Sequence, residues 1–235
     1  MGALFVWSVG CLAQTVQVAQ VLDGDSLRLH DGRDVRLIGV NAPEFGKDGQ
    51  PDEPLAREAR DLLARLVAGK QVRLEHGPER LDRYRRTLAY VHLADGTSVE
   101  QVMLREGMGF AIAIPPNLAH VDAYLRAESE ARRLGRGVWG HPYYQPRNAT
   151  QLGAADTGFR IVVGRVRRIG RGRDTIYLDL ADDFTLAIPQ AHWHHFGGAP
   201  QRFIGKRVLA RGWVTTRKRG LGLALSHPAM LEVVD

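Results

Sequence analysis

The sequence has a single cysteine, Cys11, and no apolar run long enough to cross a membrane. One cysteine excludes both a disulfide framework and a zinc site built from cysteines. The longest apolar stretch, at residues 1–14, has about a dozen apolar residues, whereas a membrane-spanning helix needs about 20. Of the 235 residues, 44% are hydrophobic and 25% are charged. These proportions exclude a wholly disordered, collagen-like or integral membrane protein.

Positive charge is concentrated in the last third of the chain. The formal net charge is +6, and residues 160–235 hold 13 Lys and Arg against 6 Asp and Glu, leaving residues 1–159 with a net charge of −1. An anionic partner is therefore expected for the C-terminal third, although charge alone does not distinguish nucleic acid from acidic lipid.

The apolar run at residues 1–14 has the length of a signal-peptide core. Cys11-Leu12-Ala13 is an acceptable cleavage site, but no Lys or Arg precedes the run. A buried N-terminal strand is therefore the alternative. We expect a signal peptide at residues 1–14 and a secreted or periplasmic protein.

The remainder predicts a mainly β fold with α-helices, in the α+β class. Alternation of apolar and polar residues predicts strands at 15–21, 26–30, 34–40, 71–75 and 87–93, and amphipathic patterns predict helices at 55–67, 99–106 and 117–134, the last capped by Asn117. A Pro- and Gly-containing linker follows at 142–158. Five further strands are expected at 159–167, 175–180, 184–188, 207–215 and 222–226, and their spacing favours a second small closed barrel.

Three segments carry charged residues at the ends of predicted strands: Asp23–Ser26, Arg36–Glu44 and Asp82–Tyr90. Each segment alone has an ordinary explanation, because Asp-Gly is a common hairpin turn and exposed arginines are usually solvated. Together they provide oxygen ligands of the kind that hold Ca²⁺, guanidinium groups that bind phosphate, and a carboxylate that can polarise water.

The motifs V-L-D-G-D-S, R-L-I-G-V-N-A-P-E and D-R-Y-R-R-T-L-A-Y, in this order and spacing, resemble the staphylococcal nuclease (thermonuclease) family. The resemblance extends from about Val16 to Trp139. It implies a five-stranded OB barrel with three helices at residues 15–141. It also implies a Ca²⁺-dependent phosphodiesterase that cleaves single-stranded DNA and RNA and leaves 3′-phosphate ends. We expect the protein to be a monomer.

The resemblance also implies roles for individual residues. Asp25, Asn41 and the carbonyl of Ala42 would bind Ca²⁺, and Glu44 would be the general base. Arg36 and Arg86 would hold the scissile phosphate, and Arg83 and Tyr84 would contact a neighbouring phosphate.

This sequence departs from the family pattern at two places. Asn41 stands where the family usually has Asp, so we expect weaker Ca²⁺ binding with the geometry retained. Ile112 and Ile114 stand where the best-known member has base-stacking tyrosines. Without these rings, a stacking contribution to binding of ~1–3 kcal/mol per base would be missing. The alternative is that both isoleucines are simply core residues.

Residues 159–235 contain no recognisable catalytic group. Six basic residues are candidate nucleic-acid ligands, namely Arg165, Arg167, Arg168, Arg217, Lys218 and Arg219, and the alternative is a solvated basic surface. His192–His195 match no standard metal site, and His120 is expected to pack or lie on the surface. The competing function for the whole chain is a non-catalytic nucleic-acid-binding protein. The combination of Glu44 with Arg36 and Arg86 favours the enzyme.

Overall fold

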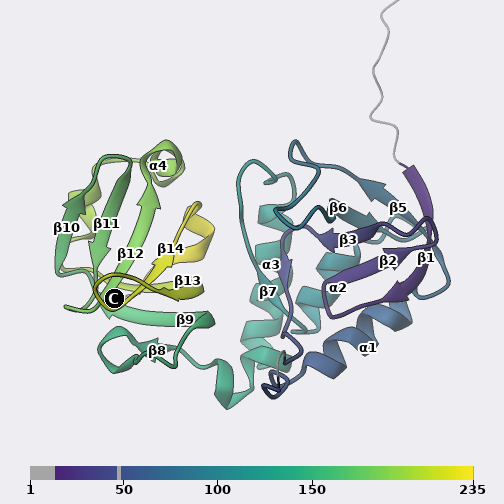
Figure 1. Ribbon diagram of the computed structural model, residues 1–235, viewed down its shortest axis with the longest axis horizontal. Coiled ribbons are helices and arrows are strands. Elements are labelled where there is room, and N and C mark those ends of the chain that lie inside the picture. Colours follow the sequence, from purple (N-terminus) through teal and green to yellow (C-terminus); the bar gives the residue numbers. More distant parts are fainter. Residues whose placement is uncertain (1–13, 47–48, 235) are drawn as a thin grey trace, which may run out of the picture.

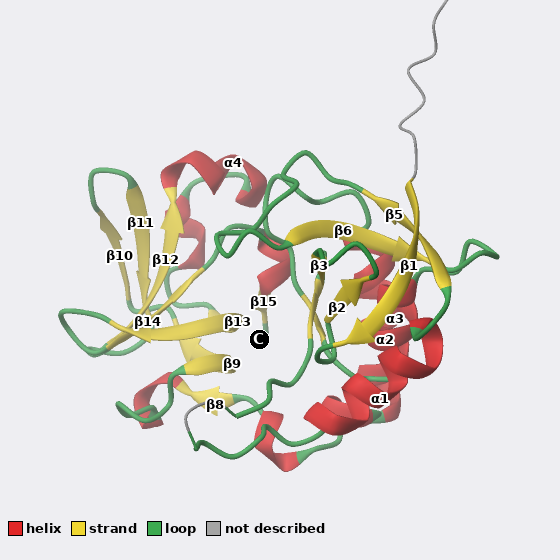
Figure 2. Cartoon of the chain, turned by 45° about the vertical axis from the view of Figure 1, so that its right-hand side comes forward, coloured by secondary structure: helices red, strands yellow, loops and turns green. Residues whose placement is uncertain are grey.

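The computed structural model describes residues 14–46 and 49–234, which form two β-rich domains side by side (Figure 1). The N-terminal domain carries the long helices, and strands dominate the C-terminal domain (Figure 2). The expected signal peptide falls almost wholly outside the described residues. Within the described ranges, no helix is both long and apolar enough to span a bilayer.

Five strands of the N-terminal domain close into a barrel in the order β1-β2-β3-β6-β5. Neighbouring strands are antiparallel, except that β3 and β6 are parallel. The strands are β1 (Gln14–Val21), β2 (Ser26–Leu29), β3 (Asp34–Leu37), β5 (Gln71–Glu75) and β6 (Thr87–His92). The predicted five-stranded barrel is confirmed, and each strand overlaps its expected range.

The period-two pattern explains why these strands close around a core. On β2 and β3 the alternating side chains of Leu27, Leu29, Val35 and Leu37 are at most 2% exposed, whereas Arg28 between the first two is exposed. Side chains at alternate positions point to the same face of a sheet, so both strands turn one apolar face inward.

Three helices accompany this barrel: α1 (Ala56–Val67), α2 (Val99–Arg105) and α3 (Val121–Leu134). The first two match the predicted ranges closely, but α3 begins four residues later than expected. The prediction that Asn117 caps α3 is wrong. Its side-chain amide instead accepts a hydrogen bond from the Glu79 amide at 3.0 Å and donates one to the Glu79 carbonyl at 2.9 Å. The Asn117 side chain therefore bonds to the Glu79 backbone and is not available to cap the first amides of α3.

Two short strands, β4 (Val40–Asn41) and β7 (Phe110–Ala111), form a separate small sheet in which Asn41 pairs with Phe110. The two isoleucines that follow β7 differ in environment. Ile112 is 8% exposed and belongs to a core cluster shared with the C-terminal domain, whereas Ile114 is 47% exposed. The alternative that both are core residues therefore holds for Ile112 only.

The strands of the C-terminal domain form one sheet in the order β10-β11-β12-β14-β13-β9-β8, with β15 also beside β13. The elements are β8 (Arg147–Asn148), β9 (Gly158–Arg165), β10 (Arg168–Arg171), β11 (Thr175–Asp179), β12 (Phe184–Pro189), α4 (Trp193–Phe196), β13 (Arg207–Thr216), β14 (Leu221–Ala224) and β15 (Leu231–Val233). The sequence anticipated five of these strands but not β8, β10 or β15.

This sheet closes in the manner of an OB barrel if β9 and β10 are taken as one bent strand. Only Val166 and Arg167 separate them, and the amides of these residues donate to the carbonyls of Lys206 at 2.9 Å and Asp179 at 2.8 Å, next to β13 and in β11 respectively. The bent strand then lies between β13 and β11. The parallel pair β12–β14 corresponds to β3–β6 of the first barrel.

The two domains share a buried core. Phe110 of β7 stacks on Phe159 of β9 with ring centroids 5.0 Å apart. In the same contact region, the carboxylate of Glu128 on α3 forms a buried ion pair with Arg211 on β13. The joining segment 142–158 is also packed, since the Tyr144 hydroxyl donates to the Pro54 carbonyl at 2.6 Å. The domains are therefore connected by packing as well as by the chain.

Candidate active site

Asp25 lies where the turn after β1 enters β2, against the end of β4. Gly24 permits this close approach, because a Cβ at position 24 would lie 2.5 Å from the Cβ of Ala42 and 2.7 Å from that of Ala59. The amide of Ala42 donates to Asp25 Oδ2 at 2.8 Å, and the Ser26 hydroxyl donates to Asp25 Oδ1 at 3.1 Å. The carboxylate is thus fixed by groups from two segments that are distant in sequence.

The Asp25 carboxyl group is 3% exposed. Burial, with smaller contributions from the negative charges of Asp23 and Glu44, raises its pKa to about 7 even though the neighbouring Arg36 lowers it. The charges of two other carboxyl groups therefore act on Asp25 at this end of the barrel. A bound cation would relieve their repulsion and the cost of burying Asp25 as an anion.

Arg36 connects two of the predicted metal ligands. Its position on β3 is opposite Ser26 on β2, and its guanidinium forms an ion pair with the Asp25 carboxylate. It also donates to the side-chain oxygen of Asn41 at 3.3 Å and to the Asp25 carbonyl at 3.4 Å. The side chain of Arg36 is 11% exposed, so one edge of the guanidinium is held inside the site.

Arg86 reaches the same group of side chains from another strand. It lies just before β6, and its Nη1 donates to the Ser26 hydroxyl at 3.3 Å. Asp82 holds it in place, because one carboxylate oxygen accepts from Arg86 Nε at 2.7 Å and the other accepts from the Arg86 amide at 2.9 Å. Ser26 is therefore a bridge between Arg86 and Asp25.

Glu44 follows β4 and its side chain is exposed. Its backbone is fixed by Glu53, whose carboxylate accepts from the Glu44 amide at 2.9 Å and whose own amide donates to the Glu44 carbonyl at 2.9 Å. The negative charge of Glu44 contributes to the raised pKa of Asp25. An exposed carboxylate beside a buried one has the solvent access that a general base requires.

Arg83 and Tyr84 lie on the exposed turn that leads to Arg86. Arg83 donates to the Tyr84 hydroxyl at 2.7 Å, and its guanidinium lies over the Tyr84 ring at 4.7 Å from the centroid. The guanidinium of Arg86 lies over the same ring at 5.6 Å. The tyrosine is 64% exposed, so this surface is accessible beside Arg86.

Ser26 and Asp82 were not assigned a role from the sequence. Both stand inside the quoted motifs, V-L-D-G-D-S and D-R-Y-R-R-T-L-A-Y, but a serine or aspartate in a turn gives no sign of its partner. The hydrogen bond from Arg86 to Ser26 crosses from the segment before β6 to β2, and only the barrel brings these segments together, whereas Asp82 holds Arg86 from within the same turn.

The oxygen atoms available at the site fit a calcium ion by their chemistry. The Asp25 carboxylate, the Asn41 amide oxygen and the Ala42 carbonyl are hard donors of the type that Ca²⁺ prefers. The excess of buried and repelling negative charge around Asp25 is the structural feature that such an ion would balance.

The basic residues of the C-terminal domain do not form one uniform group. Arg167 and Arg168 lie beside acidic residues of β11 and the following turn, at 3.8 Å from Asp182 and 2.7 Å from Asp179. The β13–β14 loop, which contains Arg217, Lys218 and Arg219, is hydrogen-bonded to that same turn through Leu221 and Asp183. Arg165 lies apart, opposite Arg207 on β13. Five of the six predicted residues therefore flank the β11–β12 turn.

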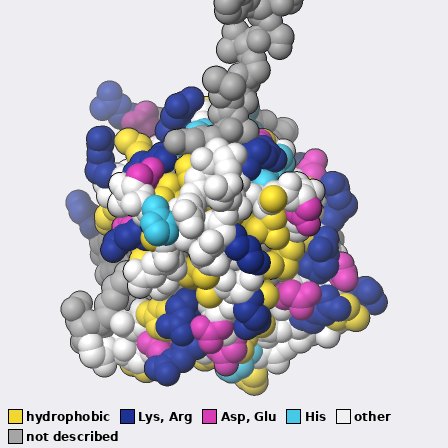
Figure 3. Space-filling view, turned by 90° about the vertical axis from the view of Figure 1, so that its right-hand side faces the viewer, with side chains coloured by type: hydrophobic (Ala, Val, Ile, Leu, Met, Phe, Trp, Pro, Cys, Tyr) yellow, Lys and Arg dark blue, Asp and Glu magenta, His cyan; other side chains and the backbone are white. Residues whose placement is uncertain are grey.

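The N-terminal domain carries a more balanced surface. In Figure 3, which views the molecule from that domain's side, dark blue basic side chains are interspersed with magenta acidic ones. This agrees with the net charge of −1 over residues 1–159.

Comparison with known proteins agrees with this geometry. A family model described as "Staphylococcal nuclease homologue" matches residues 34–141. The chain is 35% identical over 131 residues to a thermonuclease of Staphylococcus hyicus, covering 54% of this chain and 77% of that protein. It is 36% identical over 125 residues to a thermonuclease of Staphylococcus intermedius, covering 52% and 74%. An uncharacterized endonuclease of Escherichia coli O157:H7 is 34% identical over 140 residues, covering 58% and 84%.

The fold, the site and these relatives define a nuclease, a hydrolase acting on the phosphodiester bonds of nucleic acid. The chain belongs to the staphylococcal nuclease family, as its motifs indicated. The alternative of a non-catalytic binding protein is disfavoured by the same relatives. The family model begins at Asp34, so Arg36, Asn41, Glu44 and Arg86 lie inside the matched range and Asp25 lies before it.

Proposed function

We propose that this nuclease depends on Ca²⁺ and hydrolyses single-stranded DNA or RNA at the site formed by Asp25, Arg36, Asn41, Glu44 and Arg86. The supporting observation is the convergence of two arginines from different strands: Arg36 contacts Asp25, and Arg86 contacts Ser26, which donates to Asp25. A pair of guanidinium groups beside a carboxylate cluster suits binding and polarisation of a phosphodiester.

Asp25, Asn41 and the carbonyl of Ala42 would hold the ion, and a bound Ca²⁺ would supply positive charge next to the phosphate. The metal shell has one carboxylate and one amide in place of two carboxylates, so its affinity is lowered while oxygen ligation is retained. With the ion bound, the carboxylate of Asp25 stays deprotonated and Arg36 is available to the substrate phosphate.

In the proposed reaction Glu44 accepts a proton from a water molecule as the water oxygen forms a bond to phosphorus. The bond between phosphorus and the 5′ oxygen breaks, and that oxygen is protonated by Arg86 or by solvent. Arg36 and Arg86 donate hydrogen bonds to the non-bridging oxygens, on which charge increases in the transition state. The products carry a 3′-phosphate and a 5′-hydroxyl. Arg83 and Tyr84 contact the next phosphate along the strand.

The test uses heat-denatured DNA and full-length protein, with Ca²⁺ or with EGTA, and identifies the product ends. We expect cleavage with Ca²⁺ and none with EGTA. Glu44→Gln should lower kcat by ~10²–10⁴-fold, since general-base catalysis contributes that much. Glu58→Gln, an exposed substitution on α1, is the matched control and should retain wild-type activity. Equal cleavage in EGTA would contradict the metal assignment, and an active Glu44→Gln variant would contradict the base.

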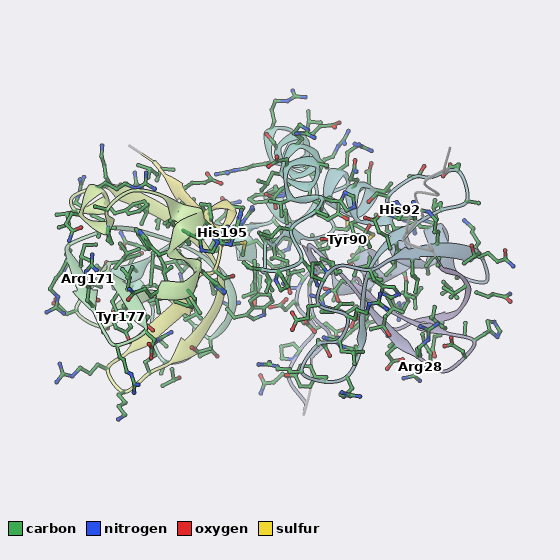
Figure 4. All side chains as sticks on the ribbon, turned by 90° about the horizontal axis from the view of Figure 1, so that it is seen from above. Arg28, Tyr90, His92, Arg171, Tyr177 and His195 are labelled. Carbon is green, nitrogen blue, oxygen red and sulfur yellow. The ribbon has the colours of Figure 1, made fainter. Side chains whose placement is uncertain are left out.

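We further propose that the C-terminal domain, at 159–235, binds the single strand and is joined to the nuclease domain, at 15–141, by the segment 142–158. OB barrels bind oligonucleotides on the face of their second and third strands and on two flanking loops. In this domain these are β11 and β12, the β10–β11 loop with Arg173, and the β13–β14 loop with Arg217, Lys218 and Arg219. Tyr177 on β11 is partly exposed and lies near Arg171 (Figure 4), where its ring offers a surface for stacking a base.

A charge substitution in the full chain tests this second proposal. Replacing Arg217, Lys218 and Arg219 together by Gln should flatten the slope of log affinity against log salt by up to ~2, because each phosphate contact to a single strand contributes ~0.7. A control with Arg57, Arg65 and Lys70 replaced by Gln changes the net charge equally on the N-terminal domain. Equal slopes for the two variants would remove the specific role of the β13–β14 loop.

The apolar N-terminal run supports export, and we propose that the protein is secreted or periplasmic and monomeric. Fractionation of cells expressing the full chain, followed by light scattering of the purified product, tests both statements. Retention of all protein in the cytosol, or a dimer mass, would contradict them.

A further inference from the structure

A second group of potential metal ligands lies on the nuclease domain, separate from the residues proposed for catalysis. Glu75 ends β5, His92 ends β6, and His120 immediately precedes α3. In the antiparallel pair of β5 and β6, Glu75 is opposite Tyr90 and Arg73 is opposite His92. Residues two positions apart lie on one face of a strand, so Glu75 and His92 are diagonal neighbours on the same face.

The three side chains converge on a common point. One carboxylate oxygen of Glu75 is 2.9 Å from His92 Nε2, and the other is 3.0 Å from His120 Nε2. One ligand atom from each residue can be chosen such that all lie within 4.8 Å of one another. A tetrahedral zinc ion has ligands about 2.1 Å away, and these are separated from each other by roughly 3.4 Å. Small side-chain shifts would therefore admit an ion.

The surroundings leave one side of this cluster open. A cavity of about 280 Å³ is lined by His92 and His120 together with Ser98, Gln101 and Arg105. On the other side, the ring of Tyr90 packs edge-on against His120 with centroids 4.5 Å apart. The exposed fractions of the side chains are 9% for His92, 30% for His120 and 31% for Glu75, so the group is shielded but reachable from solvent.

The charges of the clustered groups act on one another. Burial raises the pKa of Glu75, but hydrogen bonds and charge from His120 and His92 outweigh it, and the net pKa is lowered. Burial and the charge of Arg73 lower the pKa of His92, although Glu75 opposes this change. Metal coordination needs the carboxylate ionised and the imidazoles neutral, so binding should weaken at acidic pH.

We propose that Glu75, His92 and His120 bind a divalent transition-metal ion, with Zn²⁺ as the representative, and that the ion links β5, β6 and α3. Two imidazole nitrogens and one carboxylate oxygen are a donor set for zinc and related first-row metals, and they differ from the all-oxygen set proposed for Ca²⁺. The fourth position faces the cavity and holds water or a small ligand. Because the ion binds the folded state, it stabilises the nuclease domain.

The experiment is a Zn²⁺ titration by calorimetry on the full chain, with excess Ca²⁺ present and in a Cys11→Ser background that removes the only thiol. We expect one ion per chain. Four-coordinate Co²⁺ should give the visible absorption typical of nitrogen and oxygen ligands. At a Zn²⁺ concentration 100 times the Kd, the melting temperature should rise by ~5 °C or more.

Two substitutions separate a metal site from a purely hydrogen-bonded cluster. In His92→Gln and His120→Gln the glutamine amide can still donate to Glu75, but it is a poor zinc ligand, so affinity should fall by at least ~100-fold while the metal-free melting temperature changes little. His195→Gln is the control, because His195 lies on the other domain (Figure 4), where its ring contacts that of His194. It should leave binding unchanged.

The proposal is overturned if Zn²⁺ does not bind, or if binding survives both glutamine variants; its loss in His195→Gln instead would place the bound ion on the C-terminal domain. If either variant fails to fold, Glu75→Gln supplies the same comparison, because it removes the charged ligand while its amide oxygen can accept from one imidazole and its NH2 group can donate to the other.

Discussion

The buried ion pair between Glu128 and Arg211 gives the sharpest prediction about stability. Glu128 on α3 is 5% exposed and Arg211 on β13 is 2% exposed, so both charges are withdrawn from water at the contact between the domains. The other carboxylate oxygen of Glu128 accepts from the Ala111 amide at 2.7 Å, and Arg211 also donates to the Ala229 carbonyl at 3.2 Å. The perturbation we choose is Arg211→Met, which keeps the length of the side chain and removes its charge.

The expected loss of unfolding free energy follows from the Glu128 carboxylate, which stays buried without its partner. Removing one partner of a buried pair leaves an uncompensated charge and costs ~3–5 kcal/mol. Burial raises the pKa of Glu128 even with Arg211 opposing it. Without Arg211 the pKa rises further, and the folded protein then takes up a proton. A carboxyl group whose pKa is raised in the folded state favours folding at low pH and loses that contribution as pH rises. The loss of unfolding free energy in Arg211→Met, relative to the wild type, should therefore be largest near pH 8 and smaller near pH 5.

Urea unfolding followed by tryptophan fluorescence at these two pH values measures the effect. The double variant Arg211→Met with Glu128→Gln should recover most of the loss, because glutamine keeps an acceptor for the Ala111 amide and carries no charge. Arg132→Met removes the exposed pair with Glu232, in which both side chains are over 40% exposed, and should cost less than ~1 kcal/mol. A deficit under 1 kcal/mol at pH 8, or one that does not vary with pH, would refute this reasoning.

Three further predictions concern the active site. Asp82→Asn should lower kcat by ~10-fold or more with little change in the melting temperature, because Asp82 orients Arg86 through two hydrogen bonds; unchanged kinetics would show that Arg86 is positioned without it. Asn41→Asp should tighten Ca²⁺ binding in a calorimetric titration, and weaker binding would remove Asn41 from the metal shell. Gly24→Ala should cost ~1–3 kcal/mol in chemical denaturation, since its Cβ would overlap that of Ala42, and a neutral result would show that this turn can shift freely.

The local pattern was enough to predict the barrel strands because their alternation is complete: Leu27, Leu29, Val35 and Leu37 all face inward. It was not enough for β10, where the residues Arg168–Arg171 have no such alternation and are held by pairing with β11. The start of α3 was misplaced for a similar reason. Asn117 has the side chain of a helix cap, but its partner is the backbone of Glu79, far away in sequence.

At the site, residue types and motif order predicted the groups that lie together, whereas the supporting contacts could not be inferred. Ser26 joins Arg86 to Asp25 across 60 positions, a contact fixed by how the barrel closes. His120 was expected to pack or lie on the surface, and it is partly exposed, but its contact with Glu75 depends on the placement of α3 over the ends of β5 and β6. Contacts of this kind follow from tertiary structure, so spacing along one chain does not show them.

The two barrels share a topology but differ in the charged residues that corresponding segments carry. In the first barrel the turn before the second strand carries Asp23 and Asp25, and the third strand, β3, carries Arg36 facing them. In the second barrel the corresponding loop carries Arg173 and Asp174 in an exposed ion pair at 3.9 Å. The third strand, β12, reads Phe184–Pro189 and has no charged residue. These segments of the second barrel therefore lack the pair of carboxylates and the arginine on the third strand that we propose for catalysis in the first barrel.

The contact between the barrels adds a second reason to treat them as one working unit. Asn41 pairs with Phe110 in the small sheet, and Phe110 stacks on Phe159 of the C-terminal domain. The backbone that presents Asn41 to the proposed metal is thus supported from behind by the second barrel. Deleting residues 159–235 would expose Phe110 to water and loosen that support, so lost cleavage in such a truncation would not measure nucleic-acid binding. Substitutions that alter charge on the intact chain separate nucleic-acid binding from support of the active site, because they leave the core shared by the two domains in place.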